Sequence, residues 1–333
     1  MKQAAEPVNL INANSITIVT ACRLHLGLME ICHDEPNLFG GIGIMAEKPS
    51  TRIEGVVGTE TEIEELDIVA DAYWKSRIAN LCERWKSISN QTHLPLKKIV
   101  LHESAAPHCG LGSGTQVACA VTAILESACG RTISTTEHLK NLTGRGTRSC
   151  VGLQGFMEGG FIVDYGHCNT MSRDSLRFDF PSDWKLLLVR VSSTVGDSGD
   201  AEQQMFNQCA SHPNPNRERM LDLIETEIVP AIRTQDWVQW DHSVGKYGYY
   251  AGKIFSECQR GVYRTPEIGR LVEFLSKRGC LGAAQSSWGP TVLVVAKDQE
   301  HAMWLSNAIK IEFSDALLEF TSPQNNPARL LLK

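Results

Sequence analysis

Alternating apolar and polar residues mark short strands in the first half of the chain, and helical spacing marks segments between them. Ser15–Ala21 alternates and is rich in β-branched residues, which is typical of a strand. Apolar residues in Glu60–Trp85 recur every three or four positions and predict a helix, and a second helix is expected from about Gln116 to Ala128. Further strands are expected at Ile44–Ala46, Arg52–Val57, Lys98–His102 and Phe161–Asp164.

The second half of the chain has a different pattern, with more helix and fewer strands. Trp184–Val191 is the clearest strand, and helical spacing dominates from Ala201 to Lys277, with a break around His212–Pro215. This segregation predicts an α+β fold rather than a doubly wound parallel sheet. At about 150 residues per domain, a length of 333 fits two domains, which we divide as 1–180 and 181–333. A strand, a helix and a strand end the chain at Thr291–Ala296, Glu300–Ile309 and Ala316–Phe320.

The charge balance limits the class of partner. Lys and Arg number 32 and Asp and Glu 38, a net charge of −6, which argues against nucleic acid or an anionic membrane but permits a local basic pocket. No apolar run approaches the roughly 18 residues of a membrane span, and residues 1–10 lack the apolar core of a secretory signal. The cysteines form no CxxC pair and are typical of reduced thiols. We therefore expect a cytoplasmic protein.

A glycine-rich segment carries the clearest chemical signal. Gly110, Gly112 and Gly114 alternate immediately before the helix predicted from Gln116. Glycines let backbone N–H groups approach a ligand closely, and the following helix N-terminus favours a phosphate or diphosphate. The hydroxyls of Ser113 and Thr115 add donors or reach a metal carried by the ligand. The segment is neither a Walker loop nor a Rossmann fingerprint, and by itself a purely structural turn explains it equally well.

Two further segments give this loop a context. Ala21–Glu30, Pro107–Ala118 and Gly282–Val295 resemble, in order and spacing, the three motifs of the GHMP kinase superfamily. The middle segment is similar to its phosphate loop and the last to its C-terminal glycine-rich loop. The resemblance covers nearly the whole chain. It implies an N-terminal domain like domain 2 of ribosomal protein S5 and a ferredoxin-like α+β C-terminal domain.

One non-kinase branch of the superfamily is more similar. The segments that resemble the β-ribofuranosylaminobenzene 5′-phosphate synthase family are Phe39–Gly43, Gly144–Ser149, Gly159–His167 and Gln285–Pro290. That resemblance implies a reaction of phosphoribosyl diphosphate with 4-hydroxybenzoate or 4-aminobenzoate, with loss of CO2 and diphosphate, in tetrahydromethanopterin biosynthesis. It also implies Mg²⁺ accompanying the diphosphate, and a homodimer.

The chain departs from the kinase pattern at one informative position. Kinases of the superfamily carry Ser-Gly-x-Asp, with the Asp seven residues before a Gly-Gly pair, and here that position is Gly152. The catalytic carboxylate is therefore missing, while Arg145 and Arg148 lie near the position of the kinases' metal-binding Glu. Arginines without a base suit a site that holds a diphosphate. An ATP-dependent kinase, with Asp164 as its base, stays open as the alternative, as does a non-catalytic phosphosugar or nucleotide sensor.

These arguments give a set of candidate site residues. The candidates for phosphate contacts are Arg23, Gly110, Leu111, Gly112, Ser113, Gly114, Thr115, Gln116, Arg145 and Arg148. The candidate catalytic residues are His25, Arg148, Asp164 and His167, and the candidates for the rest of the substrate are Gln285, Ser286, Ser287 and Trp288. For the metal, Ser113 or Asp164 is the candidate, with His102, Glu103, His108, Asp197 and Asp200 as weaker options.

Several candidates also have an ordinary structural explanation. Arg23 and His25 alternate on a strand, where a surface salt bridge accounts for them. Asp164 ends a strand, which is typical of a turn cap. A histidine such as His167 is often structural, and Trp288 is explained equally well by core packing between the two domains.

Overall fold

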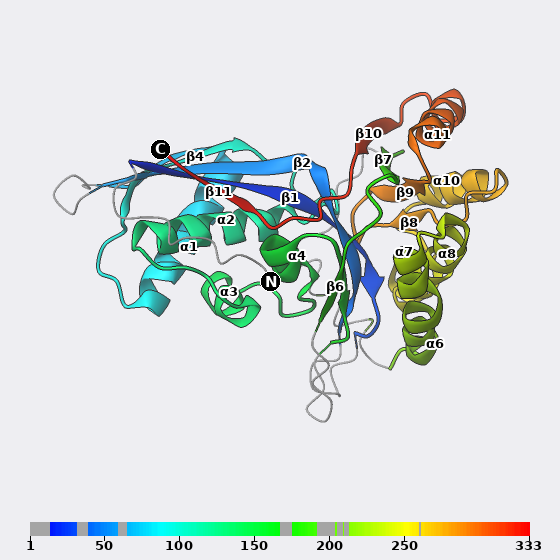
Figure 1. Ribbon diagram of the computed structural model, residues 1–333, viewed down its shortest axis with the longest axis horizontal. Helices are drawn as coiled ribbons and strands as arrows, with labels where there is room; N and C mark the ends of the chain where they lie inside the picture. Colours follow the sequence, from blue (N-terminus) through cyan, green and yellow to red (C-terminus); the bar gives the residue numbers. More distant parts are fainter. Residues whose placement is uncertain are drawn as a thin grey trace.

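The computed structural model describes residues 14–31, 39–58, 65–166, 175–191, 213–259 and 261–333, together with Gln204 and Cys209. The described part contains two β-sheets (Figure 1). The larger sheet has the order β11-β1-β2-β4-β3, and β2 also pairs with β5, which pairs with β6. Its strands are β1 (Ser15–Leu28), β2 (Gly41–Val57), β3 (Asp67–Val69), β4 (Leu96–Glu103), β5 (Phe161–Asp164), β6 (Leu176–Phe178) and β11 (Arg329–Leu332).

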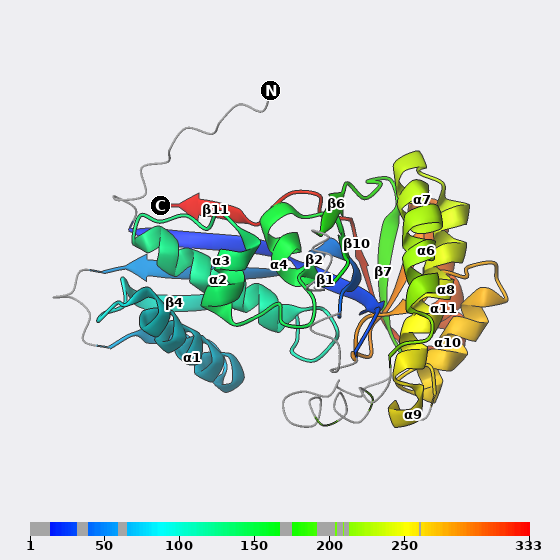
Figure 2. The same cartoon turned by 90° about the horizontal axis from the view of Figure 1, so that it is seen from below.

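Four helices lie along one face of the larger sheet (Figure 2). They are α1 (Ala72–Ser89), α2 (Ser113–Ala128), α3 (Thr136–Thr143) and α4 (Val151–Glu158). Apolar residues of β1, such as Ile16 and Ile18, form one core with Val121 and Ile124 of α2. Asp71 caps α1 by accepting the N–H of Trp74, but the N-cap residue of α2 is Gly112, which provides no side-chain cap. The N-terminus of α2 therefore keeps N–H groups for another partner.

The smaller sheet is antiparallel with the order β10-β7-β9-β8, and it has helices on both faces. Its strands are β7 (Lys185–Arg190), β8 (Ala284–Gln285), β9 (Val292–Ala296) and β10 (Leu317–Thr321). Leu186 and Leu188 face a group of helices made of α6 (Arg217–Asp222), the π-helical turn η2 (Leu223–Ile228), α7 (Val229–Thr234) and α8 (Trp237–Ile254), which α9 (Ser256–Gln259) follows. Leu187 and Val189 face the opposite side, toward α10 (Pro266–Ser276) and α11 (Gln299–Glu312).

One hydrophobic core joins the two sheets. Leu24 of β1 and Phe161 of β5 belong to the same buried cluster as Leu188 of β7 and Trp240 of α8. The ring centroids of Phe161 and Trp240 lie 5.7 Å apart in an edge-to-face arrangement. The last strand, β11, returns to the larger sheet and pairs antiparallel with β1. The two sheets are therefore packed as one body.

The α+β prediction is confirmed, and most predicted elements lie within a few residues of their observed bounds. The helix predicted from Glu60 is wrong at its start, because residues 67–69 form β3 and α1 begins at Ala72. The two strands predicted at 44–46 and 52–57 are one continuous strand, β2. The division at residue 180, the cytoplasmic location and the homodimer stay predictions.

Two further sequence expectations have an outcome. No helix in the described part of the chain is long and apolar enough to cross a bilayer. The cysteine expectation is only partly right. Seven described cysteines carry free thiols, and five of these are buried. Cys209, however, is disulfide-bonded, so the prediction that the cysteines are reduced is wrong at that position.

Candidate active site

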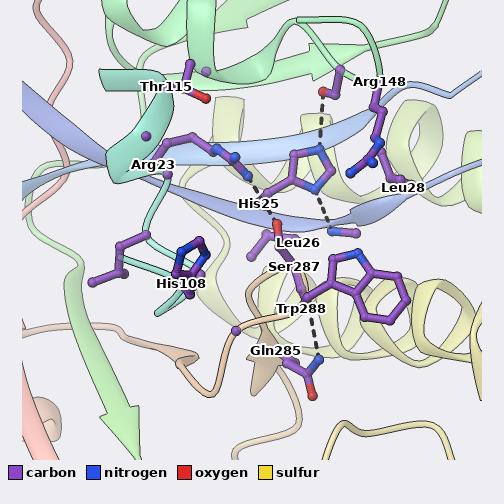
Figure 3. Close-up of a pocket in the computed structure, with 18 of the residues that line it drawn as sticks. Arg23, His25, Leu26, Leu28, His108, Thr115, Arg148, Gln285, Ser287 and Trp288 are labelled. Atoms are coloured by element: carbon purple, nitrogen blue, oxygen red, sulfur yellow. Dashed lines mark hydrogen bonds between the residues drawn. The ribbon is translucent and has the colours of Figure 1, made fainter. Parts of the chain in front are cut away.

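A cavity of about 590 Å³ opens where the two sheets meet, within the usual range for ligand pockets of roughly 300–1,000 Å³. Its lining comes from β1, the glycine loop (residues 110–115), residues 144–149 before α4, the α8–α9 region, and Gln285 of β8 with residues 287–289 after it. Figure 3 shows labelled side chains from four of these segments, among them His25, Thr115, Arg148 and Trp288, around one space. Segments far apart in the sequence thus converge on one space.

The structure brings most of the predicted site residues together. Those that line the cavity are Arg23, His25, Gly110, Leu111, Gly112, Ser113, Gly114, Thr115, Arg145, Arg148, Gln285, Ser287 and Trp288. Gln116, Asp164 and Ser286 lie outside the lining, and His167 lies outside the described residues.

The glycine loop presents backbone donors at the start of α2. Gly110 and Gly112 have φ values of +81° and +68°, which favour glycine, and a Cβ on Gly110 would stand 2.4 Å from the carbonyl oxygen of Ser286. The N–H groups of Thr115 and Gln116 bond back to the carbonyl of Gly112. Within the described part of the chain, no acceptor takes the N–H groups of Ser113 and Gly114. These two donors and the helix dipole suit an anionic group.

Arginines make the lining positive although the chain as a whole is acidic. Arg23 donates from Nη1 to the hydroxyl of Ser287 at 3.1 Å. A Cβ on Gly114 would lie 3.8 Å from Nη2 of Arg145, so this guanidinium reaches the start of α2. Arg148 and Arg77 also line the cavity, and no Asp or Glu is among the described lining residues. Four guanidinium groups in one described lining suit an anionic ligand.

His25 is buried, with both ring nitrogens within hydrogen-bond distance of a partner. Its Nδ1 accepts the backbone N–H of Gly27 at 3.2 Å, and its Nε2 lies 3.2 Å from the hydroxyl of Ser149 (Figure 3). Burial lowers the pKa of His25 well below its ordinary value, and the nearby Arg23 charge lowers it further. His25 is therefore a neutral imidazole at pH 7, and the expected surface salt bridge is wrong for it.

A group that sequence reasoning missed lies at the other end of the cavity. Tyr73 of α1 shares a 3.0 Å hydrogen bond with Nε2 of His108, and the guanidinium carbon of Arg77 lies 4.6 Å from the Tyr73 ring centroid. Burial raises the pKa of Tyr73, while the charges of Arg77 and Arg145 act in the opposite direction. His108, a weaker metal candidate, instead bonds this tyrosine. Tyr73 and Arg77 lie in a regular helix and carry no motif that distinguishes them.

Aromatic and apolar residues line another side of the cavity. The rings of Trp288 and Phe255 have centroids 4.3 Å apart, and both face the cavity together with Val262 and Tyr263. Trp288 is only 9% exposed and packs against Leu28 and Ile31. The core-packing explanation of Trp288 is thus confirmed, while its contact with a substrate ring stays a prediction.

The structure gives three candidates roles outside the lining. Ser286 is buried, donates to the carbonyl of Gly110 at 2.6 Å and accepts the N–H of His25 at 3.0 Å, so it ties β1 to the glycine loop. Gln116 accepts from the hydroxyl of Thr20 and donates to the carbonyl of Gly152. The buried carboxylate of Asp164 accepts the N–H groups of Cys150 and Gly166, as the turn-cap explanation expects. These side chains hold the backbone of segments that line or adjoin the cavity.

Of the metal candidates, Ser113 and His108 line the cavity, whereas the acidic candidates among the described residues do not. Gly152 lines it where the kinases' aspartate is expected. Among the described residues, no three His, Cys, Asp or Glu side chains form a group that could hold a metal ion. His102 pairs with Glu54 at 2.9 Å and Glu103 with Lys48 at 3.6 Å, all outside the lining. The positions 197 and 200 lie outside the described residues.

Comparison with known proteins identifies relatives over most of the chain. The family described as GHMP kinases N terminal domain matches residues 73–157, and the family described as GHMP kinases C terminal matches residues 228–315. The beta-ribofuranosylphenol 5′-phosphate synthase of Methanothermobacter thermautotrophicus is 30% identical over 85% of this chain and 89% of the relative. The protein of the same name from Methanocaldococcus jannaschii is 25% identical over 83% of this chain and 88% of the relative.

A solved structure extends the comparison to the fold. Mevalonate diphosphate decarboxylase from Staphylococcus aureus superposes with a TM-score of 0.68 over 96% of this chain and 98% of that protein, at 12% identity. At this identity the likeness shows a shared fold alone. Together with the two matched domains, it confirms the two-domain GHMP-type architecture that the sequence motifs implied.

Proposed function

Because the chain belongs to the beta-ribofuranosylphenol 5′-phosphate synthase family, on the fold of the GHMP kinases, we propose that it is a phosphoribosyltransferase. The reaction joins the anomeric carbon of phosphoribosyl diphosphate to the ring carbon of a para-substituted benzoate and releases CO2 and diphosphate. The product is a β-ribofuranosyl arene 5′-phosphate, which we assign to tetrahydromethanopterin biosynthesis.

One observation carries this proposal. The cavity combines four arginines and the free N–H groups of the glycine loop with an aromatic wall, and its described lining has no carboxylate. The arginines and N–H groups favour a polyanionic sugar, and the aromatic wall favours a planar ring. The Trp288–Phe255 wall would flank the benzoate ring, while Arg23, Arg145 and Arg148 would hold the phosphates.

The charges that develop during the proposed reaction give a reason for arginines in the cavity lining. Departure of diphosphate leaves positive charge on the sugar and places negative charge on the leaving group. Guanidinium groups and backbone N–H groups fixed before the reaction stabilise that negative charge without reorganising. Arg145 and the start of α2 lie close together and are the proposed contacts for the leaving diphosphate.

The ring chemistry explains why no general base is needed at the ring carbon. The new carbon–carbon bond forms at the ring carbon that carries the carboxylate, activated by electron release from the para substituent. The bond to the carboxylate then breaks, CO2 leaves, and its electron pair returns to the ring, so no proton leaves that carbon. Gly152 in place of a kinase aspartate is consistent with this route.

We propose that Mg²⁺ accompanies the diphosphate. The described lining offers the hydroxyl oxygens of Ser113 and Thr115, and Mg²⁺ commonly keeps several waters and binds through substrate phosphates. This donor set fits an ion carried by the diphosphate, with the two hydroxyls as the protein's ligands. When bound, the ion would supply positive charge to the leaving group.

The relatives' name supports one benzoate over the other. Their product name contains a phenol, so the proposed acceptor is 4-hydroxybenzoate rather than 4-aminobenzoate. Purified protein incubated with phosphoribosyl diphosphate, Mg²⁺ and either carboxyl-labelled benzoate should release labelled CO2 faster from 4-hydroxybenzoate. Faster release from 4-aminobenzoate would overturn the choice of acceptor, and ATP hydrolysis without any CO2 release would favour the kinase alternative.

Arg148 offers a direct test of the anion site. Replacing Arg148 with Ala removes a guanidinium from the lining, so phosphoribosyl diphosphate should bind about 1.5–3 kcal/mol more weakly, the range for a charge-assisted hydrogen bond. Isothermal titration calorimetry measures this change. Arg219→Ala is the matched control, since Arg219 is exposed and lies outside the lining. Equal losses in both variants would show that Arg148 acts only through net charge.

A further inference from the structure

The hydrogen bonds of His25 fix which of its nitrogens carries the proton. The backbone N–H of Gly27 can only donate, so Nδ1 of His25, which accepts it at 3.2 Å, must present a lone pair. A neutral imidazole has one N–H group, which therefore lies on Nε2. Nε2 faces the hydroxyl oxygen of Ser149 at 3.2 Å, so His25 donates and Ser149 accepts.

The hydroxyl of Ser149 can then act only as a hydrogen-bond donor. Its oxygen also accepts the N–H of Val151 at 3.3 Å, at the start of α4. A hydroxyl has two lone pairs and one hydrogen, so both acceptor positions are occupied. No acceptor for its hydrogen is found in the described part of the chain. Ser149 lines the cavity next to Arg148, which leaves the cavity as the direction for that hydrogen.

We propose that Ser149 donates a hydrogen bond to a phosphate oxygen of the substrate, and that His25 is the positioning residue that holds it in this role. A hydroxyl with free lone pairs can turn to accept or donate, whereas this one can only donate. Donors that are fixed before binding lose little freedom on contact with an anion. The identity of the substrate rests on the proposed function, while the direction of the His25–Ser149 bond does not.

This assignment changes the role expected for His25. With its Nε2 protonated and its Nδ1 engaged by Gly27, His25 has no free lone pair to take a proton from the substrate. It therefore acts through Ser149 rather than on the reacting atoms.

Binding of two small anions tests the donor and identifies the phosphate that it meets. Inorganic diphosphate and ribose 5-phosphate are titrated separately into wild type, Ser149→Ala and Ser149→Thr. Ser149→Ala should weaken one of the two anions about tenfold, as expected for a lost hydrogen bond to a charged group, and Ser149→Thr should restore most of the affinity. 4-Hydroxybenzoate should bind equally to all three. Unchanged affinity for both phosphates, or a loss confined to the benzoate, would overturn the proposal.

A matched control separates binding from helix stability, because Ser149→Ala also removes the acceptor of Val151 N–H. Thr135→Ala removes a hydroxyl acceptor at the start of α3, where the Thr135 side chain accepts the N–H of His138 at 3.1 Å outside the cavity. Both variants should lower the melting temperature, but only Ser149→Ala should lose anion affinity. Equal affinity losses in both would show that Ser149 acts only by stabilising α4.

Nitrogen-15 NMR of histidine-labelled wild type tests the proton position without any ligand. The His25 signals, assigned by their loss in His25→Gln, should be those of a neutral ring protonated on Nε2 at pH 7. A ring protonated on Nδ1 would overturn the proposal even if diphosphate binds. Failure of wild type to bind either phosphate, with the expected NMR result, would instead count against the proposed function.

Discussion

A buried histidine that stays neutral links the stability of this protein to pH. Burial and the Arg23 charge lower the pKa of His25 in the folded state, whereas in the unfolded chain it titrates near its ordinary value of about 6.5. Above that pH both states carry the neutral ring, so the stability is complete. As pH falls below about 6.5, the unfolded state binds a proton that the folded state does not, and stability is lost.

We predict that the pH dependence of the unfolding free energy below about pH 6.5 becomes weaker when His25 is replaced. His25 should contribute up to about 1.4 kcal/mol of lost unfolding free energy per pH unit below about 6.5. Urea unfolding at about pH 7.5 and about pH 5.5 should therefore show a larger fall for wild type than for His25→Gln. Parallel falls in the two proteins would mean that His25 titrates alike in both states.

Asp164 is predicted to matter for stability and not for ligand affinity. Its buried carboxylate accepts two backbone N–H groups, and Asp164→Ala leaves both without that acceptor. The free energy of unfolding should fall by about 2 kcal/mol or more, while the diphosphate affinity of the folded protein stays within about threefold. Asp179→Ala is the control, because Asp179 is 75% exposed and pairs with Arg177 at the surface. A loss of diphosphate affinity in Asp164→Ala but not in Asp179→Ala would show that Asp164 contributes to ligand binding.

At the scale of the elements, the sequence pattern correctly predicted the strands and helices that are determined by interactions between residues close in the sequence. The clear alternation of β1 and the apolar run of β9 identified both strands. The helix predicted from Glu60 began too early because β3 is held by a distant partner, pairing parallel with β4 about 30 residues further on. Helical spacing contains no information about that pairing, nor about the cap that Asp71 gives to α1.

The candidate site shows the same limit. The glycine loop was found because three close glycines before a helix are a local signal. Tyr73 and Arg77 were missed because their place in the cavity depends on a tertiary contact, the hydrogen bond from Tyr73 to His108. Ser286 was assigned to the substrate because one sequence cannot show which of two adjacent serines is turned inward.

Close packing of two loops predicts a strong effect at Gly289. A Cβ on Gly289 would stand 2.3 Å from the backbone nitrogen of Gly110, so Gly289→Ala must push the glycine loop away from residues 285–289. Diphosphate affinity should fall by about tenfold or more, since the loop donors lose their fixed positions. Gly269→Ala, where the nearest atom lies 3.5 Å away in ordinary contact, is the control and should change affinity little. Titration calorimetry on both variants decides the matter.

At the scale of the whole molecule, the net charge of −6 and the positive cavity have separate roles. The acidic surface repels extended polyanions, while the four lining arginines act at short range inside the cavity, where screening by salt is weaker. On the proposed function, the cavity would therefore take only anions small enough to enter it. This selection fits a phosphorylated small molecule and disfavours nucleic acid.

The shared core predicts that the two sheets unfold together. Trp240 of α8 contacts Phe161 of the larger sheet and Phe180 and Trp184 before the smaller one, with ring centroids 4.9–6.0 Å apart. Trp240→Ala should cost about 3–5 kcal/mol, the usual range for deleting a buried tryptophan. Because this core spans both sheets, calorimetry should show one transition in wild type and one, at lower temperature, in the variant. Hydrogen exchange should then accelerate in β1 and β9 alike. Two resolved transitions, or faster exchange in β9 alone, would show that the sheets are independent.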